Sequence, residues 1–298
     1  MKTLTGYIRS FLSDSDKSTL FFTSIFCGAI IFINYQFGLE TGIQKKLSVP
    51  FKLIAWYAVF LAALGLPLLI GLRNTTQRPF SPLFFGTVFL APFLFACKYV
   101  LRVPLSVTGD PVLNQAWNKI LYWPLLLAAL LLVLYLLNRF FYHDRSFFGL
   151  RNRLKNADWY WLLLVLMIPL VLLAATQPDF QAVYPKLKML TPGESLSGIP
   201  VWQAFFFELS YGSDFLGIEL FFRGFLVLTL SRWLGREAIL PIAVFYCSIH
   251  FGKPLGECIS SYFGGIILGV IVYHTRSIRG GLLVHLGIAW LMEIAGML

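Results

Sequence analysis

Long apolar runs separated by short polar connections make up most of this chain. Runs of about 18 to 23 residues are long enough for a helix to cross a hydrocarbon core of roughly 30 Å. Five such runs lie near residues 18–37, 50–72, 79–101, 119–142 and 158–176. Shorter or interrupted runs lie near residues 200–231, 237–251, 256–274 and 278–297. The pattern predicts an all-α fold, a polytopic transmembrane helix bundle of about eight or nine helices.

The composition indicates that lipid is the solvent of this fold. Of the 298 residues, 58% are hydrophobic and 13% are charged, and a soluble domain of this length would expose much of that apolar surface to water. A membrane β-barrel is excluded because its strands alternate apolar and polar residues, whereas residues 125–134 are apolar throughout. The first apolar run follows a polar stretch of mixed charge that ends at Lys17, which predicts a membrane anchor and not a cleaved signal peptide.

The Lys and Arg residues behind the net charge of +10 lie in the connections between apolar runs. This distribution is typical of the positive-inside bias of multi-pass membrane proteins, so we expect no nucleic-acid partner. The most basic connection, which we place on the cytoplasmic face, contains Arg139, Arg145, Arg151, Arg153 and Lys155. The same face then receives Arg73, Arg78, Arg232, Arg236, Arg276 and Arg279. This orientation does not fit three basic residues, Lys45, Lys46 and Lys52.

The composition changes near residue 200. Residues 1–199 contain generic apolar helices and then an irregular loop, whose turn-forming residues are Pro178, Pro185, Pro192 and Gly193. Residues 200–298 place Glu, His, Arg and clustered Gly inside helical runs. The sequence shows no internal repeat and no linker that would separate soluble domains. We therefore expect one membrane domain overall, with N-terminal helices and loop in 1–199 and the functional core in 200–298.

Glu219 and Arg223 are ionisable residues inside an apolar run. An ionisable side chain in hydrocarbon costs several kcal/mol unless it is paired or faces water, so each one is a functional candidate. Their four-residue spacing stacks them on one face of an α-helix, where they neutralise each other. A structural ion pair and a catalytic role are both consistent with this spacing, because buried pairs are weak evidence for either.

His250 and His285 lie at the end of one apolar run and inside another. A lone histidine in a helix bundle is more often a hydrogen-bonded structural residue than a ligand. Two histidines in neighbouring helices, beside a buried carboxylate, favour a function. Imidazoles and a carboxylate are the groups that activate a water, either as a general base with stabilising groups or as metal ligands.

Other polar residues of this region have simpler interpretations. We expect Asp214 and Glu257 to cap helices or to extend toward the membrane surface. Glu293 lies inside the last apolar run, where a carboxylate is costly enough to suggest a role, but we expect it to face the interface near the chain end. A ridge of small residues, which lets membrane helices approach closely, is predicted at Ser261, Gly265 and Gly269. Without metal-ligand spacing, the cysteines are interpreted as small buried side chains: Cys27, Cys97, Cys247 and Cys258.

Three segments carry the strongest candidates in a fixed order: 218–223 (Ile-Glu-Leu-Phe-Phe-Arg), 246–250 (Tyr-Cys-Ser-Ile-His) and 285–289 (His-Leu-Gly-Ile-Ala). They resemble Glu-Glu-x-x-x-Arg, Phe-x-x-x-His and His followed four residues later by Asn or Asp. These are the motifs of the CAAX protease and bacteriocin-processing (CPBP, or Abi) family of intramembrane proteases. The resemblance covers roughly the last third of the chain and rests on the three motifs together. Residues 264–278 also resemble the family's linker between motifs.

The resemblance implies a reaction in which the first Glu and the second-motif His activate a water that attacks the scissile peptide carbonyl. The third-motif His and Asn would stabilise the oxyanion. This sequence keeps both histidines and the Arg, but it has Ile218 at the position of the first Glu and Ala289 at the position of the Asn. Both departures are at positions whose residues take part in the reaction that the resemblance implies.

Two carboxylates are candidates for the missing one. Glu219 points about 100° away from Ile218 on an α-helix, so it takes over the role only with a rotation or a local distortion. Asp214 lies one turn before Ile218 on the same face and is available if the helix extends that far.

The function expected from the resemblance is that of an intramembrane endopeptidase in a bacterial plasma membrane. Glu219 or a nearby carboxylate and His250 would activate water, His285 would hold the oxyanion, and Arg223 would complete the site. The implied substrates are prenylated C-terminal peptides or peptide precursors, so membrane lipids and a peptide or lipidated protein are the expected partners. The oligomeric state stays open.

Other functions and a metal also remain open. A catalytically inactive CPBP scaffold that binds a peptide, lipid or protein partner is the main alternative. A small transporter is disfavoured because the first half offers no polar segments that match those of the second. His250, His285 and one carboxylate also make a three-ligand set for a divalent metal such as zinc, with an open water position. We assign no cofactor, because the family is usually argued to be of the glutamate type.

Overall fold

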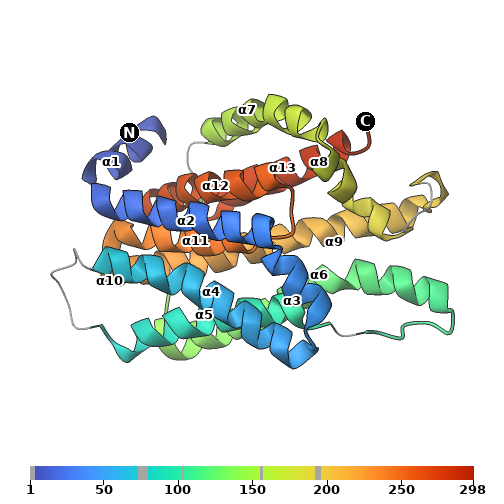
Figure 1. Ribbon diagram of the computed structural model, residues 1–298, viewed down its shortest axis with the longest axis horizontal. Coiled ribbons are helices and arrows are strands. Elements are labelled where there is room, and N and C mark those ends of the chain that lie inside the picture. The colour runs from blue at the N-terminus through green and yellow to red at the C-terminus, as the bar shows by residue number, and fades with distance from the viewer. Residues whose placement is uncertain (1–3, 73–79, 103, 155–156, 192–195) are drawn as a thin grey trace. The chain divides into compact units, whose positions relative to one another are not determined.

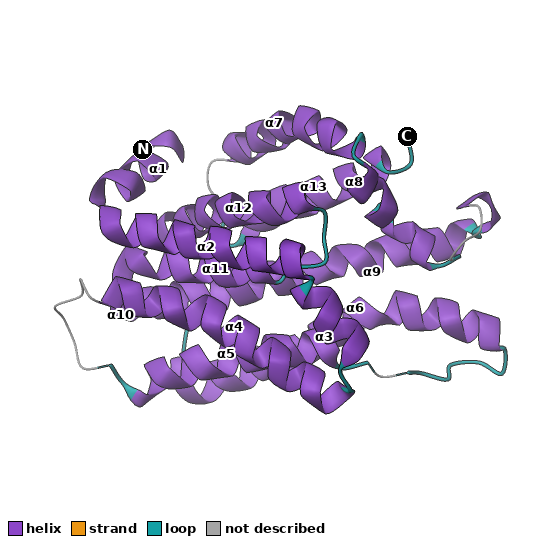
Figure 2. Ribbon diagram, in the orientation of Figure 1, coloured by secondary structure: helices purple, strands orange, loops and turns teal. Residues whose placement is uncertain are grey.

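The computed structural model describes residues 4–72, 80–102, 104–154, 157–191 and 196–298. Within this part, every regular element is a helix, which confirms the predicted all-α class (Figure 2). Figure 1 labels the α-helices in chain order. Five residues named in the sequence analysis lie outside these described ranges: Arg73, Arg78, Lys155, Pro192 and Gly193.

Six helices in the described part are long and apolar enough to cross a membrane, which supports a multi-pass membrane protein. They are α2 (Lys17–Phe37), α4 (Val49–Leu72), α5 (Pro82–Val100), α6 (Pro111–Leu137), α7 (Ala157–Ala175) and α12 (Leu255–Thr275). Five of them correspond to the five long runs of the sequence, and α12 corresponds to the run near 256–274. The others in this part of the chain are α1 (Leu4–Asp14), α3 (Leu39–Lys46), α8 (Pro178–Val183), α9 (Val201–Glu219), α10 (Leu228–Leu234), α11 (Ile239–Ser248) and α13 (Arg279–Ala295).

Polar residues at the N-termini define where several of the long helices begin. The Asp16 carboxylate accepts a hydrogen bond from the Thr19 amide at 2.6 Å and caps α2. Asp110 accepts from the Val112 amide at 2.8 Å and caps α6, with proline in the first helical position. Such caps satisfy amides that have no partner inside the helix, and a proline there lacks the amide that would need one.

The described chain forms two compact units. The first unit consists of Met1–Leu101, Phe148–Asn152 and Phe221–Ser277. In it, α11 packs against α2, α4 and α12. All ten residues of α11 are buried, so this short helix is the centre of the first unit.

The second unit consists of Arg102–Phe147, Arg153–Leu220 and Ile278–Leu298. In it, α6 packs on α9, α7 packs on α13, and α9 and α13 pack on each other. The contacts of Gly212 with Leu286 and Trp290, and of Phe215 with His285, show that α9 and α13 run antiparallel. The predicted division of the chain at residue 200 stays a prediction.

The predicted ridge of small residues on α12 is confirmed. A Cβ placed on Gly265 would lie 3.2 Å from the Cα of Ala243 in α11, and one placed on Gly269 would lie 2.9 Å from a methyl carbon of Ile239. Because glycine has no side chain, the two helices approach more closely there than larger residues would allow. The ridge thereby fixes α12 against the helix that leads to His250.

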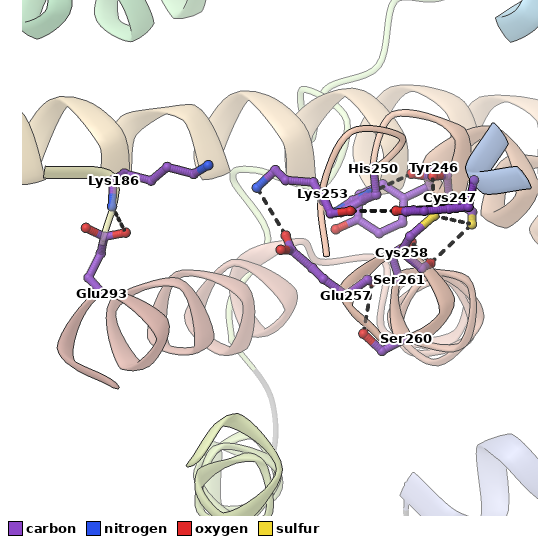
Figure 3. A network of polar contacts seen from close by, with 11 residues as sticks. Lys186, Tyr246, Cys247, His250, Lys253, Glu257, Cys258, Ser260, Ser261 and Glu293 are labelled. Carbon is purple, nitrogen blue, oxygen red and sulfur yellow. Dashed lines mark hydrogen bonds and ion pairs between the residues drawn. The ribbon is translucent and has the colours of Figure 1, made fainter. Parts of the chain in front are cut away.

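The prediction that the cysteines are buried is confirmed for Cys27, Cys247 and Cys258, whereas Cys97 is partly exposed. The sulfur atoms of Cys247 and Cys258 lie 3.8 Å apart, where α11 meets α12 (Figure 3).

Candidate active site

A π-helix begins directly after Glu219. Glu219 is the last residue of α9, and the π-helix η4 (Leu220–Val227) contains Arg223. A π-helix bonds residue i to i+5, is wider than an α-helix and often occurs at functional sites. The predicted stacking of Glu219 on Arg223 assumed α-helical spacing, which does not continue through this segment, and their pairing stays a prediction.

Glu219 and His285 form a hydrogen-bonded pair in the second unit. The Nδ1 atom of His285 lies 2.9 Å from Oε1 of Glu219, whose side chain is fully buried. Phe215 packs edge-on against the imidazole with ring centroids 4.8 Å apart. A carboxylate only accepts hydrogen bonds, so Nδ1 carries a proton and the ring is held with Nε2 directed away from Glu219.

His250 is oriented by Tyr246 in the first unit. Nδ1 of His250 lies 2.9 Å from the main-chain oxygen of Tyr246, and the two rings meet at 4.7 Å (Figure 3). A carbonyl oxygen only accepts, so Nδ1 is again the protonated nitrogen. In the neutral imidazole, the lone pair is then on Nε2, as a general base requires.

Arg223 contacts the same tyrosine. Its guanidinium carbon lies 3.9 Å from the centroid of the Tyr246 ring, and the Arg223 side chain is 1% exposed. Guanidinium over an aromatic face is a favourable cation–π contact, stronger when water is excluded. The ring of Tyr246 therefore contacts both Arg223 and His250.

The turn that carries His250 is fixed by local contacts. After α11 ends, Gly252 adopts φ +76°, a conformation that favours glycine. The Tyr35 hydroxyl of α2 donates to the carbonyl of Lys253 at 2.6 Å. Lys253 also forms an ion pair of 3.1 Å with Glu257, which lies in the first turn of α12 (Figure 3).

Residues 200–291 match the model of a protein family described as Rce1-like, type II CAAX prenyl endopeptidase. This match supports membership of this part of the chain in the CPBP family. The Rce1-like domain contains Glu219, Arg223, His250 and His285, and the family is one of intramembrane proteases. No curated protein and no solved structure matches the chain.

The two positions at which the sequence analysis expected departures from the family motifs are both buried. Ile218 is 7% exposed and brings no polar group. Ala289 is 3% exposed and belongs to an apolar cluster with Phe207 and Tyr211 of α9. At position 289, the side chain therefore contributes packing and cannot donate a hydrogen bond to an oxyanion.

Asp214 was a candidate only if the helix of Ile218 extended back to it. This condition is met, because α9 includes both residues. Asp214 lies within electrostatic reach of the hydroxyl of Tyr122 in α6. The ring of Tyr122 carries the guanidinium of Arg102 at 4.5 Å. Asp214 is thus part of a polar group between α9 and α6 in the second unit.

Glu293 does not face the interface as expected. It is 2% exposed, and its two oxygens accept the main-chain amides of Lys186 at 2.8 Å and Leu187 at 3.3 Å, which begin the 3-10 helix η2 (Lys186–Met189; Figure 3). Burial follows because a carboxylate with two amide donors no longer needs water. The expectation failed because nothing in the sequence indicated that residues 186 and 187 would supply these donors.

Glu208 was missed by the sequence analysis. Its carboxyl group lies within hydrogen-bond reach of that of Glu293, and among the described residues no N–H or O–H donor reaches its buried oxygens. A glutamate inside the apolar run of α9 was the signal that could have identified it. Burial and a neighbouring carboxyl group both favour the neutral form of a glutamate.

The described residues contain no group of three or more His, Cys, Asp or Glu side chains arranged to bind a metal ion. The three-ligand zinc set of His250, His285 and one carboxylate joins residues of both units and stays a prediction.

Proposed function

We propose that this chain is an intramembrane endopeptidase that hydrolyses a peptide bond near a lipidated C-terminus or in a peptide precursor, in a bacterial plasma membrane. The observation that carries the proposal is the contact of His250 Nδ1 with the Tyr246 carbonyl. Because Nδ1 donates to this carbonyl, Nε2 is the nitrogen with the lone pair that a general base needs. The position of His250 in the second motif of a CPBP-family domain supports the same role.

His250 acts as the general base in the proposed reaction. Nε2 takes a proton from a water, whose oxygen attacks the scissile carbonyl carbon and forms a tetrahedral intermediate. The carbon–nitrogen bond then breaks, and the imidazolium returns the proton to the leaving amine. Arg223 is a positioning residue, because it contacts the Tyr246 ring against which His250 packs.

His285 stabilises the oxyanion. Its Nδ1 lies 2.9 Å from Oε1 of Glu219, which fixes the ring and directs Nε2 to the oxyanion. We therefore propose that Glu219 positions His285, and that it is not the base that replaces the glutamate missing at Ile218. Ala289, at the position of the third-motif Asn, is apolar and cannot donate a hydrogen bond. His285 therefore stabilises the oxyanion without a second donor from that motif.

A second candidate function is a catalytically inactive CPBP scaffold that binds a peptide, lipid or protein partner. Ile218 and Ala289 favour it, since both positions where the family has chemistry are here buried and apolar. The two oriented imidazoles argue against it.

Cleavage of lipidated and unlipidated peptides by the purified protein in lipid vesicles tests the proposal. His250→Ala should lower kcat by about 100-fold or more, the usual contribution of a general base. Glu219→Gln should lower kcat, because the His285 ring loses the carboxylate that positions it. Asp214→Asn is the matched carboxylate control, and a comparable loss there would identify Asp214 as a participant.

Each variant is first shown to be folded by its unfolding transition. A folded parent protein that cleaves no peptide of the panel would favour the scaffold. Cleavage that survives His250→Ala would overturn the assignment of His250 as the general base.

A further inference from the structure

A groove runs between α2 and α12 in the first unit. Its volume is about 550 Å³, within the range of roughly 300–1,000 Å³ that is typical of small-molecule sites. Most of its walls are apolar or aromatic, and they include Gly28, Ile31, Phe32, Ile259, Tyr262 and Phe263. None of the residues assigned to catalysis lines it.

The groove is about as long as one leaflet of a bilayer is deep. It extends on α2 from Ser24 to Gln36, which at 1.5 Å per residue is about 18 Å. The hydrocarbon of one leaflet is roughly 15 Å deep. Both walls are helices long and apolar enough to cross a membrane, and Phe32 and Phe263 are 60% and 58% exposed. The groove is therefore open to lipid.

One end of the groove is polar. Tyr35, which lines this end, is hydrogen-bonded to the carbonyl of Lys253 and lies within electrostatic reach of Glu257. The Lys253–Glu257 pair keeps some exposure, 29% and 16% for the two side chains, and presents one cation and one anion (Figure 3). These charges complement a headgroup that carries both a phosphate and an amine.

We propose that this groove binds one acyl chain of a zwitterionic aminophospholipid from the surrounding bilayer, with its phosphate at Lys253 and its amine at Glu257. An acyl chain gains no hydrophobic free energy by moving from bilayer to groove, because both are apolar. Retention then depends on packing along the groove and on the headgroup contacts. Gly28 leaves room for the chain, since a Cβ there would meet no atom within 4 Å.

A peptide fits this groove poorly. Its main-chain N–H and C=O groups would need partners at membrane depth. The hydroxyls that line the groove already have partners: Ser24 contacts Tyr262 at 3.0 Å and the Leu20 carbonyl at 2.8 Å, and Tyr35 bonds to Lys253. An acyl chain has no such main-chain groups and therefore needs no hydrogen-bond partners in the groove.

The test is photo-crosslinking of the full chain in vesicles of phosphatidylethanolamine that carries a diazirine in one acyl chain. Peptide mapping should place crosslinks on α2 and α12. Gly28→Phe, which fills the groove, should lower them at least fivefold. Gly86→Phe is the matched control, because Gly86 is exposed on α5 and a Cβ there also meets open space. This control should leave the α2 and α12 crosslinks unchanged.

The headgroup is tested with phosphatidylglycerol that carries the same diazirine chain. Labelling of the groove should be several-fold weaker with this lipid, and Lys253→Gln with Glu257→Gln should remove the difference. Crosslinks spread evenly over the lipid-facing helices, insensitivity to Gly28→Phe, or equal labelling by the two lipids would overturn the proposal. Displacement of the label by a lipidated peptide would overturn the assignment to a bilayer lipid. No arm measures cleavage, so this result is independent of the proposed protease activity.

Discussion

The two histidines of the candidate site are held by different kinds of acceptor. His250 donates from Nδ1 to a neutral main-chain carbonyl, whereas His285 donates to the buried carboxylate of Glu219. A carbonyl fixes a tautomer without adding charge, and a carboxylate also stabilises the protonated ring. The two imidazoles thus share Nδ1 as the donor and differ in the charge of its acceptor.

Substitution of His285 should separate stability from activity. His285→Ala leaves the buried Glu219 carboxylate without its imidazole donor and should lower the free energy of unfolding by about 3 kcal/mol or more. His285→Asn keeps an N–H near the position of Nδ1 and should recover most of that loss, without restoring cleavage. Unfolding in mixed micelles measures the first effect and peptide cleavage the second. Equal destabilisation by both substitutions would argue against the Glu219 contact as the cause.

The paired carboxyl groups of Glu208 and Glu293 should respond differently to the same substitution. Glu208→Gln supplies an amide N–H where a proton is needed, so the free energy of unfolding should stay within about 0.5 kcal/mol of the parent or rise. Glu293→Gln removes one of the two acceptors for the Lys186 and Leu187 amides and should cost about 1–3 kcal/mol. Unfolding and proteolysis near residues 184–190 measure both. The reverse order would contradict a shared proton.

Among the secondary-structure elements, the sequence best predicted the helices that are long and apolar enough to cross a membrane. The five long runs became helices that can cross a membrane because few other structures satisfy the main chain in lipid. The π-helix at Leu220–Val227 was not predicted, since its hydrogen-bond pattern leaves no mark in hydrophobic periodicity. The motifs identified Glu219 and His285 as candidates, but their mutual contact depends on the antiparallel packing of α9 and α13, which no local pattern encodes.

The close approach of α11 and α12 can be tested with neighbouring glycines. Gly265→Leu forces a side chain into the main chain of α11 and should cost about 1–3 kcal/mol or more of unfolding free energy. Gly264→Leu is the control, because a Cβ there meets no atom within 4 Å. Unfolding transitions of both variants measure the difference. Similar stability of the two would show that the ridge does not set the helix separation.

At the scale of the whole molecule, the basic connections predict how the chain crosses the membrane. The connections before and after α6 should lie on opposite faces, since α6 is long and apolar enough to span. With the Arg-rich connection inside, Arg145→Cys should resist a membrane-impermeant maleimide in intact cells and react after lysis. Ser106→Cys, in the exposed connection before α6, should react in intact cells, and the parent protein controls for its own cysteines. The opposite labelling pattern would invert the orientation.

The segment Leu220–Val227 makes the number of residues, and not only their identity, matter for function. A wider turn accommodates more chain than an α-helix does over the same rise, so loss of one residue there would favour ordinary α-helical bonding. Each residue of an α-helix turns the direction of the side chains by roughly 100°. A one-codon deletion in this segment would therefore redirect the glutamate while leaving every motif residue in the sequence. A change in the length of this segment would thereby alter the site while the signature residues stay the same.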